Sequence, residues 1–379
     1  MLYFDHSATT PIHPDVQSLI NELNQDIYGN PSSVHTAGRK AKYVVETARK
    51  QIANTINCDP KEIIFTGGGS EANNLVLWNM IYSDRKHVIT SSIEHPAILT
   101  VLQQLEHLSI THTVVPVNNY GCVNPEDIDS AIKDDTGLIT IMMANNEVGT
   151  VEPLQDIAKV AKKHDILFHS DGVQVLGKLP IDVQKLGVDM MSFSAHKFYG
   201  PKGVGALYIK EGIAMKPLIV GGSQEKSLRA GTENVGGIAG LGFAAELVTK
   251  NLRDVGHTLT GLEIQFKTKF SEQNPNIIYN GFEDNHLPGL INLTISGIAS
   301  DLLLIHLDNE DIAVSSGSAC SAGTISPSPV LKAMGINDKQ NLETIRISAG
   351  RDNTLSLIHI LRAHETRHDL VCRLLLEKK

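Results

Sequence analysis

The sequence SAHKFYGPKG, residues 194–203, places a lysine and a glycine-containing turn between two apolar segments. The apolar-rich residues 188–193 before it and 204–209 after it predict two buried strands. Lys197 therefore stands at the end of a strand, which is where α/β enzymes hold reactive groups. A lysine in this position is either a reactive amine or a solvated loop residue, and the local spacing does not separate these two possibilities.

Composition places the chain among ordinary globular proteins. It has 379 residues, of which 41% are hydrophobic and 20% are charged, enough for a large core and for two domains. The formal net charge is −9, so there is no excess of basic residues to neutralise phosphates. We therefore expect a protein that binds neither nucleic acid directly nor a membrane.

The four cysteines are far apart in the sequence, at positions 58, 122, 320 and 372. No Cys-x-x-Cys pair occurs, which argues against a disulfide framework or a cysteine zinc site. The first residues lack a basic segment followed by an apolar run, and no stretch approaches the length of a membrane span. These features predict a cytoplasmic protein.

Up to about residue 210, predicted strands alternate with predicted helices. This alternation predicts a mainly parallel sheet covered on both faces, with polar groups gathered at the strand ends. The predicted strands are residues 63–66, 87–90, 113–117, 138–143 and 166–171, and the predicted helices are 37–56, 75–82 and 154–164.

The pattern changes after residues 220–232. Helices are predicted over 235–250 and on to about residue 272, followed by more widely spaced strands and a closing helix over 355–376. This arrangement predicts a smaller α+β domain. The strands are predicted at residues 277–279, 291–295, 312–314 and 345–348.

A glycine-rich turn, GGGSEANN at residues 67–74, follows the predicted strand 63–66 and opens a helix. A turn of this kind presents free backbone N–H groups at the positive end of a helix dipole, which suits a phosphate group. It is neither a dinucleotide-binding fingerprint nor a P-loop. A purely structural turn is the alternative.

The small, polar loop at residues 315–329 carries one cysteine, Cys320. Long loops without secondary structure in compact domains usually have a function. A cysteine there is either a functional thiol or an incidental exposed one, and exposed thiols are liable to oxidation.

Several of these residues suit a site for a phosphorylated pyridine aldehyde. Such a ligand needs an amine, an acid for its ring nitrogen, a flat group to stack on its ring, donors to its ring oxygen and a phosphate nest. Their positions are too scattered for spacing alone to prove that they converge. The candidates are Lys197, Asp171, His95, Asn146 and Gln174, with Gly69, Ser70, Ser194 and His196 for the phosphate.

Seven motifs along the chain resemble the cysteine desulfurases of the NifS/IscS-like branch of class V pyridoxal-phosphate enzymes. The resemblance implies fold type I, with a large domain built on a mainly parallel seven-stranded sheet and a smaller α+β domain. It implies a large domain over residues 13–255, and a small domain of residues 1–12 and 256–379 that carries the cysteine loop. The motifs are FDHSATTP (4–11), GNPSSVH (29–35), NNEVGT (145–150), DMMSFSAHK (189–197), RAGTEN (229–234), SSGSAC (315–320) and IRIS (345–348).

The resemblance also implies a role for each matching residue. Lys197 would hold pyridoxal 5'-phosphate as an imine, Asp171 would pair with its ring nitrogen and His95 would stack on its ring. Asn146 and Gln174 would bind the ring oxygen. The phosphate would be bound by Gly69, Ser70, Ser194 and His196, with Thr232 arriving from the second subunit of a homodimer.

For the substrate, the resemblance implies that Arg346 clamps the carboxylate of L-cysteine through two hydrogen bonds, with Asn146 nearby. Cys320 would take the sulfur as a persulfide and leave alanine. The loop after Cys320 is long enough for the thiol to reach both the substrate and an acceptor protein. That acceptor would be an iron–sulfur scaffold or a tRNA-thiolation enzyme.

The chain departs from the family pattern at two places. Gly69-Ser70 replaces the usual Ala-Thr, and the serine keeps the hydroxyl group. Gly172 replaces the usual alanine after Asp171, which removes a methyl group expected near the ring.

Other functions stay open at this level. One is a class V aminotransferase or lyase that does not use Cys320, such as a selenocysteine lyase. Another is a non-catalytic sulfur carrier or scaffold. The residues His6, His35, His169 and His196 lack the spacing of a zinc site, so no metal is expected.

Overall fold

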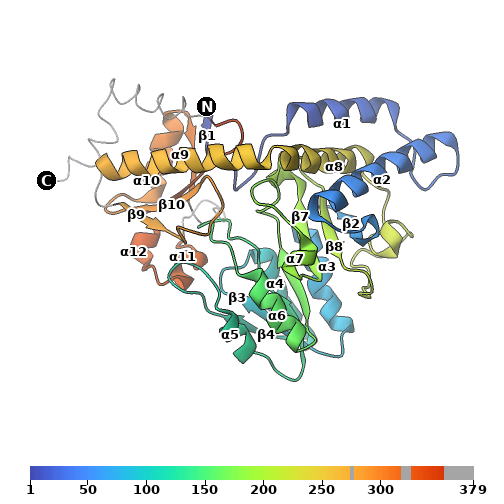
Figure 1. The fold of residues 1–379 in the computed structure, drawn as a ribbon, viewed down its shortest axis with the longest axis horizontal. Helices are drawn as coiled ribbons and strands as arrows, with labels where there is room; N and C mark the ends of the chain where they lie inside the picture. Colours follow the sequence, from blue (N-terminus) through green and yellow to red (C-terminus); the bar gives the residue numbers. More distant parts are fainter. Residues whose placement is uncertain (274–276, 317–325, 354–379) are drawn as a thin grey trace.

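A seven-stranded sheet organises the larger part of the molecule in this computed structural model, which describes residues 1–273, 277–316 and 326–353 (Figure 1). Neighbouring strands are parallel except around β8, which runs antiparallel to both of its neighbours. In spatial order the strands are β2 (Ile63–Thr66), β8 (Gly205–Ile209), β7 (Met190–Ser194), β6 (Leu167–Asp171), β5 (Thr136–Thr140), β3 (His87–Ser91) and β4 (Thr111–Val115).

Helices pack against both faces of this sheet. Successive side chains along each buried strand point to opposite faces, so each strand contributes to both layers. On β7, Met190 packs with α3 (Gly69–Trp78) and α4 (Pro96–Leu105) on one face. Its neighbour Met191 belongs to the larger core on the other face, which includes residues of the remaining helices of this part. These are α1 (Pro14–Asp26), α2 (Thr36–Ile56), α5 (Pro125–Ser130), α6 (Leu154–Lys163), α7 (Val183–Leu186) and α8 (Val235–Lys250).

The smaller part is built on two short sheets. One is four-stranded and antiparallel, with the order β12 (Ser315–Ser316), β13 (Thr344–Ser348), β10 (Leu290–Ile295) and β9 (Ile277–Asn280). The other pairs β1 (Leu2–Tyr3) with β11 (Ile312–Ala313) in parallel, so the N-terminus lies in this part of the molecule (Figure 1). Its helices are α10 (Ser300–Asn309), α11 (Pro329–Ala333) and α12 (Asp338–Asn341).

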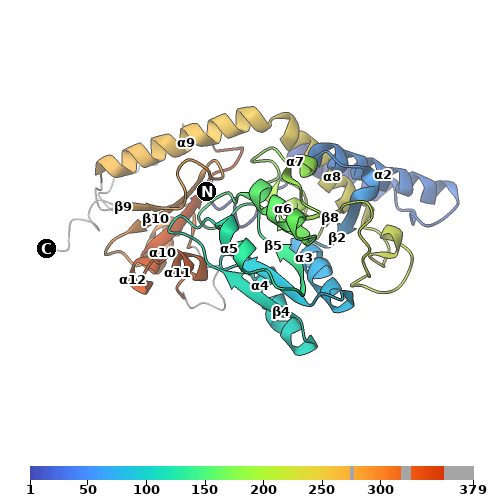
Figure 2. The ribbon, with the colours of Figure 1, turned by 60° about the horizontal axis from the view of Figure 1, so that its bottom comes forward.

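The long helix α9 (Leu252–Gln273) runs along one edge of the molecule, from the end of α8 to the four-stranded sheet (Figure 2). Its residues Leu259, Leu262 and Phe266 are buried against Ile291 and Leu293 of β10. The helix therefore connects the two parts and supplies core to the smaller one.

The predicted fold class is confirmed: the sheet is seven-stranded and mainly parallel, and an α+β region follows it. Strand positions differ by a few residues, as at β4, which was predicted over 113–117. Helices α1, α5, α7, α10, α11 and α12 were not predicted from the sequence; of the residues of α1, Val16 alone is buried. The domain boundaries stay a prediction, and the predicted helix 355–376 lies outside the described residues.

The strand ends of the large sheet gather the residues singled out in the sequence. Strands β3, β5, β6 and β7 are parallel, so their C-terminal ends meet at one edge of the sheet. β2 joins them there because two antiparallel pairings through β8 restore its direction. This edge therefore carries the glycine turn after β2, His95, Asn146, Asp171 and Lys197.

Candidate active site

Lys197 lies in a short 3-10 turn, Ala195–Lys197, directly after β7. Its Nζ donates hydrogen bonds to the carbonyl oxygens of Ser7, at 2.5 Å, and Ala8, at 2.9 Å. The N-terminal segment is held there by Thr10, whose hydroxyl donates to the carbonyl of His196 and accepts from the backbone N–H of Tyr199. The amine thus contacts two carbonyl oxygens of the N-terminal segment.

The surroundings of Lys197 make its amine unusually easy to deprotonate. Burial, together with the positive charge of Arg346, lowers the pKa of Lys197 to about 8, while Asp171 and Asp5 oppose the change. An amine with such a pKa has a sizeable neutral fraction near physiological pH, which nucleophilic chemistry requires. This separates Lys197 from an ordinary loop lysine.

Asp171 ends β6 and is buried. Its Oδ2 accepts a 2.6 Å hydrogen bond from Nδ2 of Asn73, and its Oδ1 accepts from the backbone N–H of Val173. Both donors match the carboxylate oxygens, which accept hydrogen bonds. Asn73 was not singled out by the sequence, where it is one of two consecutive asparagines in a helix.

His95 caps the N-terminus of α4, where its Nδ1 accepts from the backbone N–H of Ala97. Burial lowers the pKa of His95; Asp171 opposes this lowering and Lys197 adds to it, so the ring lies within electrostatic range of both. Asn145 fixes the segment before it, donating from Nδ2 to the carbonyl of Ile93. A neutral imidazole ring is therefore available beside the acid and the amine.

The glycine turn leads into α3 through Gly68, whose φ of +153° suits a residue without Cβ. No side chain caps the first turn of α3, so its backbone N–H groups and the dipole end are free to meet an anion. A Cβ on Gly69 would lie 3.5 Å from Cβ of Ser194, which places the first residue of α3 beside the end of β7. The turn and Ser194 thus line one spot, with the exposed Ser70 beside them.

His196 follows Ser194, and its Nδ1 lies 3.1 Å from Oγ1 of Thr9. Burial lowers the pKa of His196 to about 4, helped by the neighbouring cations Lys197 and Lys202. The ring is therefore neutral at physiological pH and acts as a hydrogen-bonding group rather than as a charge.

Arg346 reaches the site from β13 in the smaller part and is buried. Its two terminal nitrogens donate to the carbonyl of Asn146, at 3.0 Å, and to Oδ1 of Asp5, at 2.7 Å. Its Nε is buried without a partner. A guanidinium held in this way offers charge and a spare donor to a carboxylate ligand.

Gln174 shares an acceptor with Lys197, because its Nε2 also donates to the carbonyl of Ser7, at 2.9 Å. Its Oε1 accepts from Nζ of Lys178 at 3.1 Å. Burial lowers the pKa of Lys178 to about 7, and the charges of Lys197 and Arg346 add to the lowering. Ser7 and Lys178 were both missed from the sequence, although Ser7 lies inside the matching motif at residues 4–11.

Thr232 of this chain is exposed and lines a cavity of about 200 Å³ together with Thr66, Gly67 and Arg229. Arg229 pairs with Glu71 in the first turn of α3, at 3.0 Å, and Glu71 also accepts from the backbone N–H of Gly67. The cavity therefore lies beside the glycine turn.

The glycine at position 172 has a packing consequence that the sequence did not reveal. A Cβ there would lie 2.5 Å from Cε of Met191 and 3.2 Å from Cε1 of Phe193. The space that an alanine methyl would need is therefore taken by Met191 on the neighbouring strand β7.

Cys320 lies outside the described residues, but the chain on either side of its loop is anchored at the site. Before it, Ser315 of β12 pairs with Arg346 in the register of β13. After it, the hydroxyl of Ser328 donates to the buried carboxyl group of Glu147, next to Asn146. Burial raises the pKa of Glu147 to about 7.

The donor set at this edge of the sheet fits a phosphorylated pyridine aldehyde. It combines an amine of lowered pKa, an uncapped helix N-terminus with two serine hydroxyls beside it, and a buried carboxylate with a ring nearby. Across residues 1–273, 277–316 and 326–353, no group of three or more His, Cys, Asp or Glu side chains has the geometry of a metal site.

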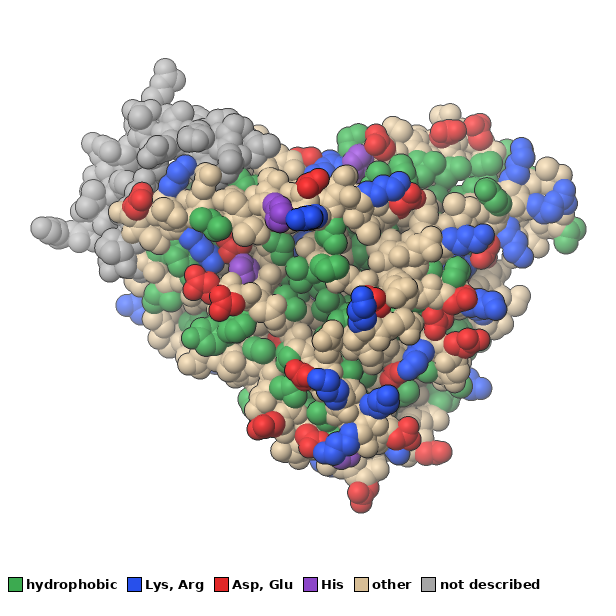
Figure 3. Space-filling model, in the orientation of Figure 1, with side chains coloured by type: hydrophobic (Ala, Val, Ile, Leu, Met, Phe, Trp, Pro, Cys, Tyr) green, Lys and Arg blue, Asp and Glu red, His purple; other side chains and the backbone are tan. Residues whose placement is uncertain are grey.

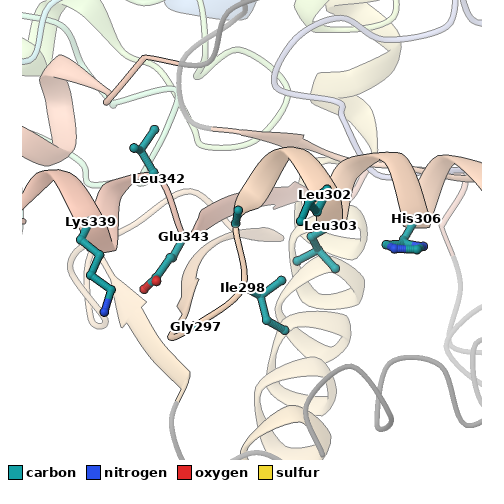
Figure 4. Close-up of a pocket in the computed structure, with 9 residues that line it drawn as sticks. Gly297, Ile298, Leu302, Leu303, His306, Lys339, Leu342 and Glu343 are labelled. Carbon is teal, nitrogen blue, oxygen red and sulfur yellow. The ribbon is translucent and has the colours of Figure 1, made fainter. Parts of the chain in front are cut away.

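A larger cavity, of about 370 Å³, lies in the smaller part between α10 and α12 (Figure 4). Its lining includes Ile298, Leu302 and Leu303, with Lys339 and Glu343 at its side. None of the residues placed at the sheet edge lines it.

Acidic and basic side chains are interspersed over the molecular face in Figure 3, without a broad patch of one sign. No helix in the described part of the chain is both long and apolar enough to span a membrane.

Comparisons with known proteins agree on one family. Residues 2–361 match the model of the class V aminotransferases. The chain is 44% identical to a protein of Dictyoglomus turgidum named cysteine desulfurase IscS, an alignment that covers 92% of this chain and 89% of that protein.

Solved structures are similar along almost the whole chain. A structure titled NifS-like protein has a TM-score of 0.90 at 34% identity and covers 96% of this chain and 98% of its own. A structure titled SspA in complex with cysteine has a TM-score of 0.82 at 36% identity and covers 92% of this chain and 99% of its own.

Proposed function

The chain belongs to the class V aminotransferases and is a cysteine desulfurase, and from that premise we propose that it uses pyridoxal 5'-phosphate at Lys197 to act on L-cysteine. The observation that carries this proposal is the amine of Lys197, which burial and Arg346 bring to a pKa of about 8. Asp171 and His95 lie within electrostatic range of each other there. The similar structure titled SspA in complex with cysteine supports the choice of substrate.

Each residue of the site has one task in this proposal. When bound, the cofactor supplies an electron sink for bond changes at the amino acid. Lys197 holds it covalently and afterwards moves protons, Asp171 keeps its ring nitrogen charged and His95 covers its ring. Asn146 and Gln174 bind the ring oxygen; Gly69, Ser70, Ser194 and His196 bind the phosphate.

Arg346 binds the carboxylate of cysteine, for which its free Nε and its charge are suited. The carbon–sulfur bond of the substrate then breaks and the sulfur joins Sγ of Cys320 as a persulfide. The carbon takes up a proton, so cysteine and one thiol yield alanine and one persulfide without an external oxidant. The role of Cys320 is supported by its sequence motif and by the anchoring of Ser315 and Ser328 at the site.

The test compares Cys320→Ala with Lys197→Ala in the full chain. We expect Cys320→Ala to keep the yellow cofactor absorbance and to lose the release of sulfide and alanine from cysteine. Lys197→Ala loses the absorbance that borohydride bleaches in the wild type. Desulfuration by Cys320→Ala at the wild-type rate would indicate another class V reaction, such as that of a selenocysteine lyase, and a protein that ignores added cofactor would contradict the proposal altogether.

We further propose that the enzyme is a homodimer in which Thr232 of one subunit completes the phosphate site of the other. Large apolar side chains are exposed around the loops that would meet a partner: Tyr28 is 84%, Val34 88% and Val220 81% exposed. These loops lie on the same side of the molecule, next to α2 (Figures 1 and 2). Such exposure favours an interface.

A mixing experiment tests this arrangement. Subunits carrying Lys197→Ala and subunits carrying Thr232→Ala are each impaired as homodimers. If Thr232 acts across the interface, a mixed dimer contains one site with both residues intact, and activity rises above that of either parent. No rise in verified mixed dimers would place Thr232 in its own subunit's site and contradict the proposal.

The sulfur acceptor is proposed as a protein, either an iron–sulfur scaffold or a tRNA-thiolation enzyme, in the cytoplasm. The name of the Dictyoglomus turgidum relative, cysteine desulfurase IscS, supports sulfur transfer to an acceptor protein. Capture of proteins on the trapped Cys320 persulfide, with Cys320→Ala as the control, tests this part: an acceptor is retained by the persulfide alone.

A further inference from the structure

Asn73 lies on the buried face of α3 and is only 1% exposed. Its Nδ2 donates to Oδ2 of Asp171 at 2.6 Å, between residues 98 positions apart in the sequence. This contact is the one side-chain hydrogen bond to Asp171 among the contacts of the described residues, and the backbone N–H of Val173 holds the other oxygen.

The oxygen of the Asn73 amide shows that this orientation costs free energy. Its Oδ1 is buried without a hydrogen-bond partner. Reversing the amide would bring Oδ1 against the carboxylate oxygen, so the nitrogen must face Asp171 because a carboxylate only accepts. An unpartnered buried carbonyl is unfavourable. An apolar residue would avoid this loss, since Ala72, Leu75 and Val76 are buried in the same helix.

We propose that Asn73 is a positioning residue, which holds the Asp171 carboxylate in a fixed orientation toward the ring nitrogen of the cofactor. This inference rests on the proposed cofactor site. The same helix carries Gly69 and Ser70 in its first turn, so α3 fixes both the phosphate nest and the acid that pairs with the ring. One rigid element thus sets the distance between two anchors of one ligand.

The test is the binding of pyridoxal phosphate to the apoprotein, with the visible spectrum of the complex as a second readout. We expect Asn73→Ala to weaken binding about tenfold, as for the loss of a hydrogen bond to a charged group. The visible spectrum of its complex differs from that of the wild type, because the Asp171 carboxylate is no longer held toward the ring nitrogen. Asn73→Asp keeps the size but sets a second carboxyl group against Asp171, so binding falls further.

The matched control is Asn79→Ala, at the other end of the same helix. Asn79 donates from Nδ2 to the carbonyls of Leu75 and Lys216, so its loss weakens α3 without touching Asp171. We expect wild-type affinity and a wild-type spectrum in this variant. Asp171→Ala and the wild type show separately whether the cofactor site exists.

The outcomes separate the two proposals. A wild-type apoprotein that does not bind the cofactor overturns the proposed function. Binding that needs Asp171 but is unchanged in Asn73→Ala and Asn73→Asp overturns the role of Asn73 alone. An equal loss in Asn79→Ala also overturns it, because the effect would then come from the helix. If Asn73→Ala does not fold, Asn73→Asp decides the matter.

Discussion

The amine of Lys197 lies 2.5 Å from the carbonyl oxygen of Ser7, 190 positions earlier in the chain. Residues of the first turn after β1 therefore form part of the surface around the reactive amine. The same carbonyl oxygen accepts a hydrogen bond from Gln174. Two residues proposed to bind the cofactor are therefore held by one backbone atom. The N-terminal segment is thus a structural component of the site.

The reactivity of Lys197 should titrate near pH 8 in the apoprotein. Burial and Arg346 disfavour the charged amine, so its neutral form appears well below the ordinary value of 10.5. We expect the rate of its modification by an amine reagent, followed by peptide mass spectrometry, to rise with a midpoint at about pH 8. In Arg346→Gln the midpoint moves up, because one repelling charge is gone; a midpoint near 10.5 in the wild type would contradict the electrostatics described.

Replacement of Arg346 by lysine should affect the binding of cysteine more than turnover. A lysine loses the fork that contacts Asn146 and Asp5 and its Nε donor. We expect KM for cysteine to rise about tenfold, as for the loss of a hydrogen bond to a charged group, with a smaller fall in kcat. Arg85→Lys, which changes a guanidinium paired with Asp165 before the start of β3, is the control. An unchanged KM would remove Arg346 from substrate binding.

The substitution Thr10→Val should weaken the attachment of the N-terminal segment that contacts Lys197. The Thr10 hydroxyl donates to the His196 carbonyl and accepts from the N–H of Tyr199, whose φ of +65° is unusual for a tyrosine. We expect a loss of about 1–3 kcal/mol in the free energy of unfolding, measured in denaturant, together with weaker binding of pyridoxal phosphate. The control Thr55→Val, within α2, loses a hydroxyl bonded to its own helix and should change stability much less.

Because of Glu152, the free energy of unfolding should fall as the pH rises. Burial raises the pKa of Glu152 from an ordinary 4.5 to about 8, and its Oε1 has no partner. The folded state therefore holds a proton that the unfolded state releases, so the contribution of this carboxyl group is fully present below pH 4.5 and is lost as the pH rises through about 8.

Comparing the wild type with Glu152→Gln isolates this group from the others that titrate. Gln keeps an acceptor for the N–H of Val123, which now bonds to Oε2. We expect the stability of the wild type relative to the variant to fall by up to about 1.4 kcal/mol per pH unit between these limits. A difference that stays constant with pH would mean that the carboxyl group is already ionised in the folded protein.

Much of the sheet edge could be predicted because its signals are local. Asp171 and Lys197 each follow an apolar run that ends in a polar residue, and the glycine turn before Ser70 separates a strand from a helix. Such patterns depend on neighbours within a few residues. The matching motifs then identified the family and the activity.

Other parts of the site had no local signal. Nothing near Asn73 indicates that it faces Asp171, and nothing near Ser7 indicates that its carbonyl meets Lys197 and Gln174. These contacts join segments about 100 to 190 positions apart. Helix α1 was missed for a related reason, since α8, the helix that it packs against, lies far away in the sequence.

The alternation of strands and helices in the larger part, the family and the residue types available for catalysis follow from the sequence alone. Which of these residues meet, and in what electrostatic setting, depends on the tertiary structure. The pKa of Lys197 illustrates the difference: it depends on burial and on Arg346, a residue from the smaller part of the molecule. Burial and charge proximity are properties of the assembled fold, because the chain brings distant segments together only when it packs.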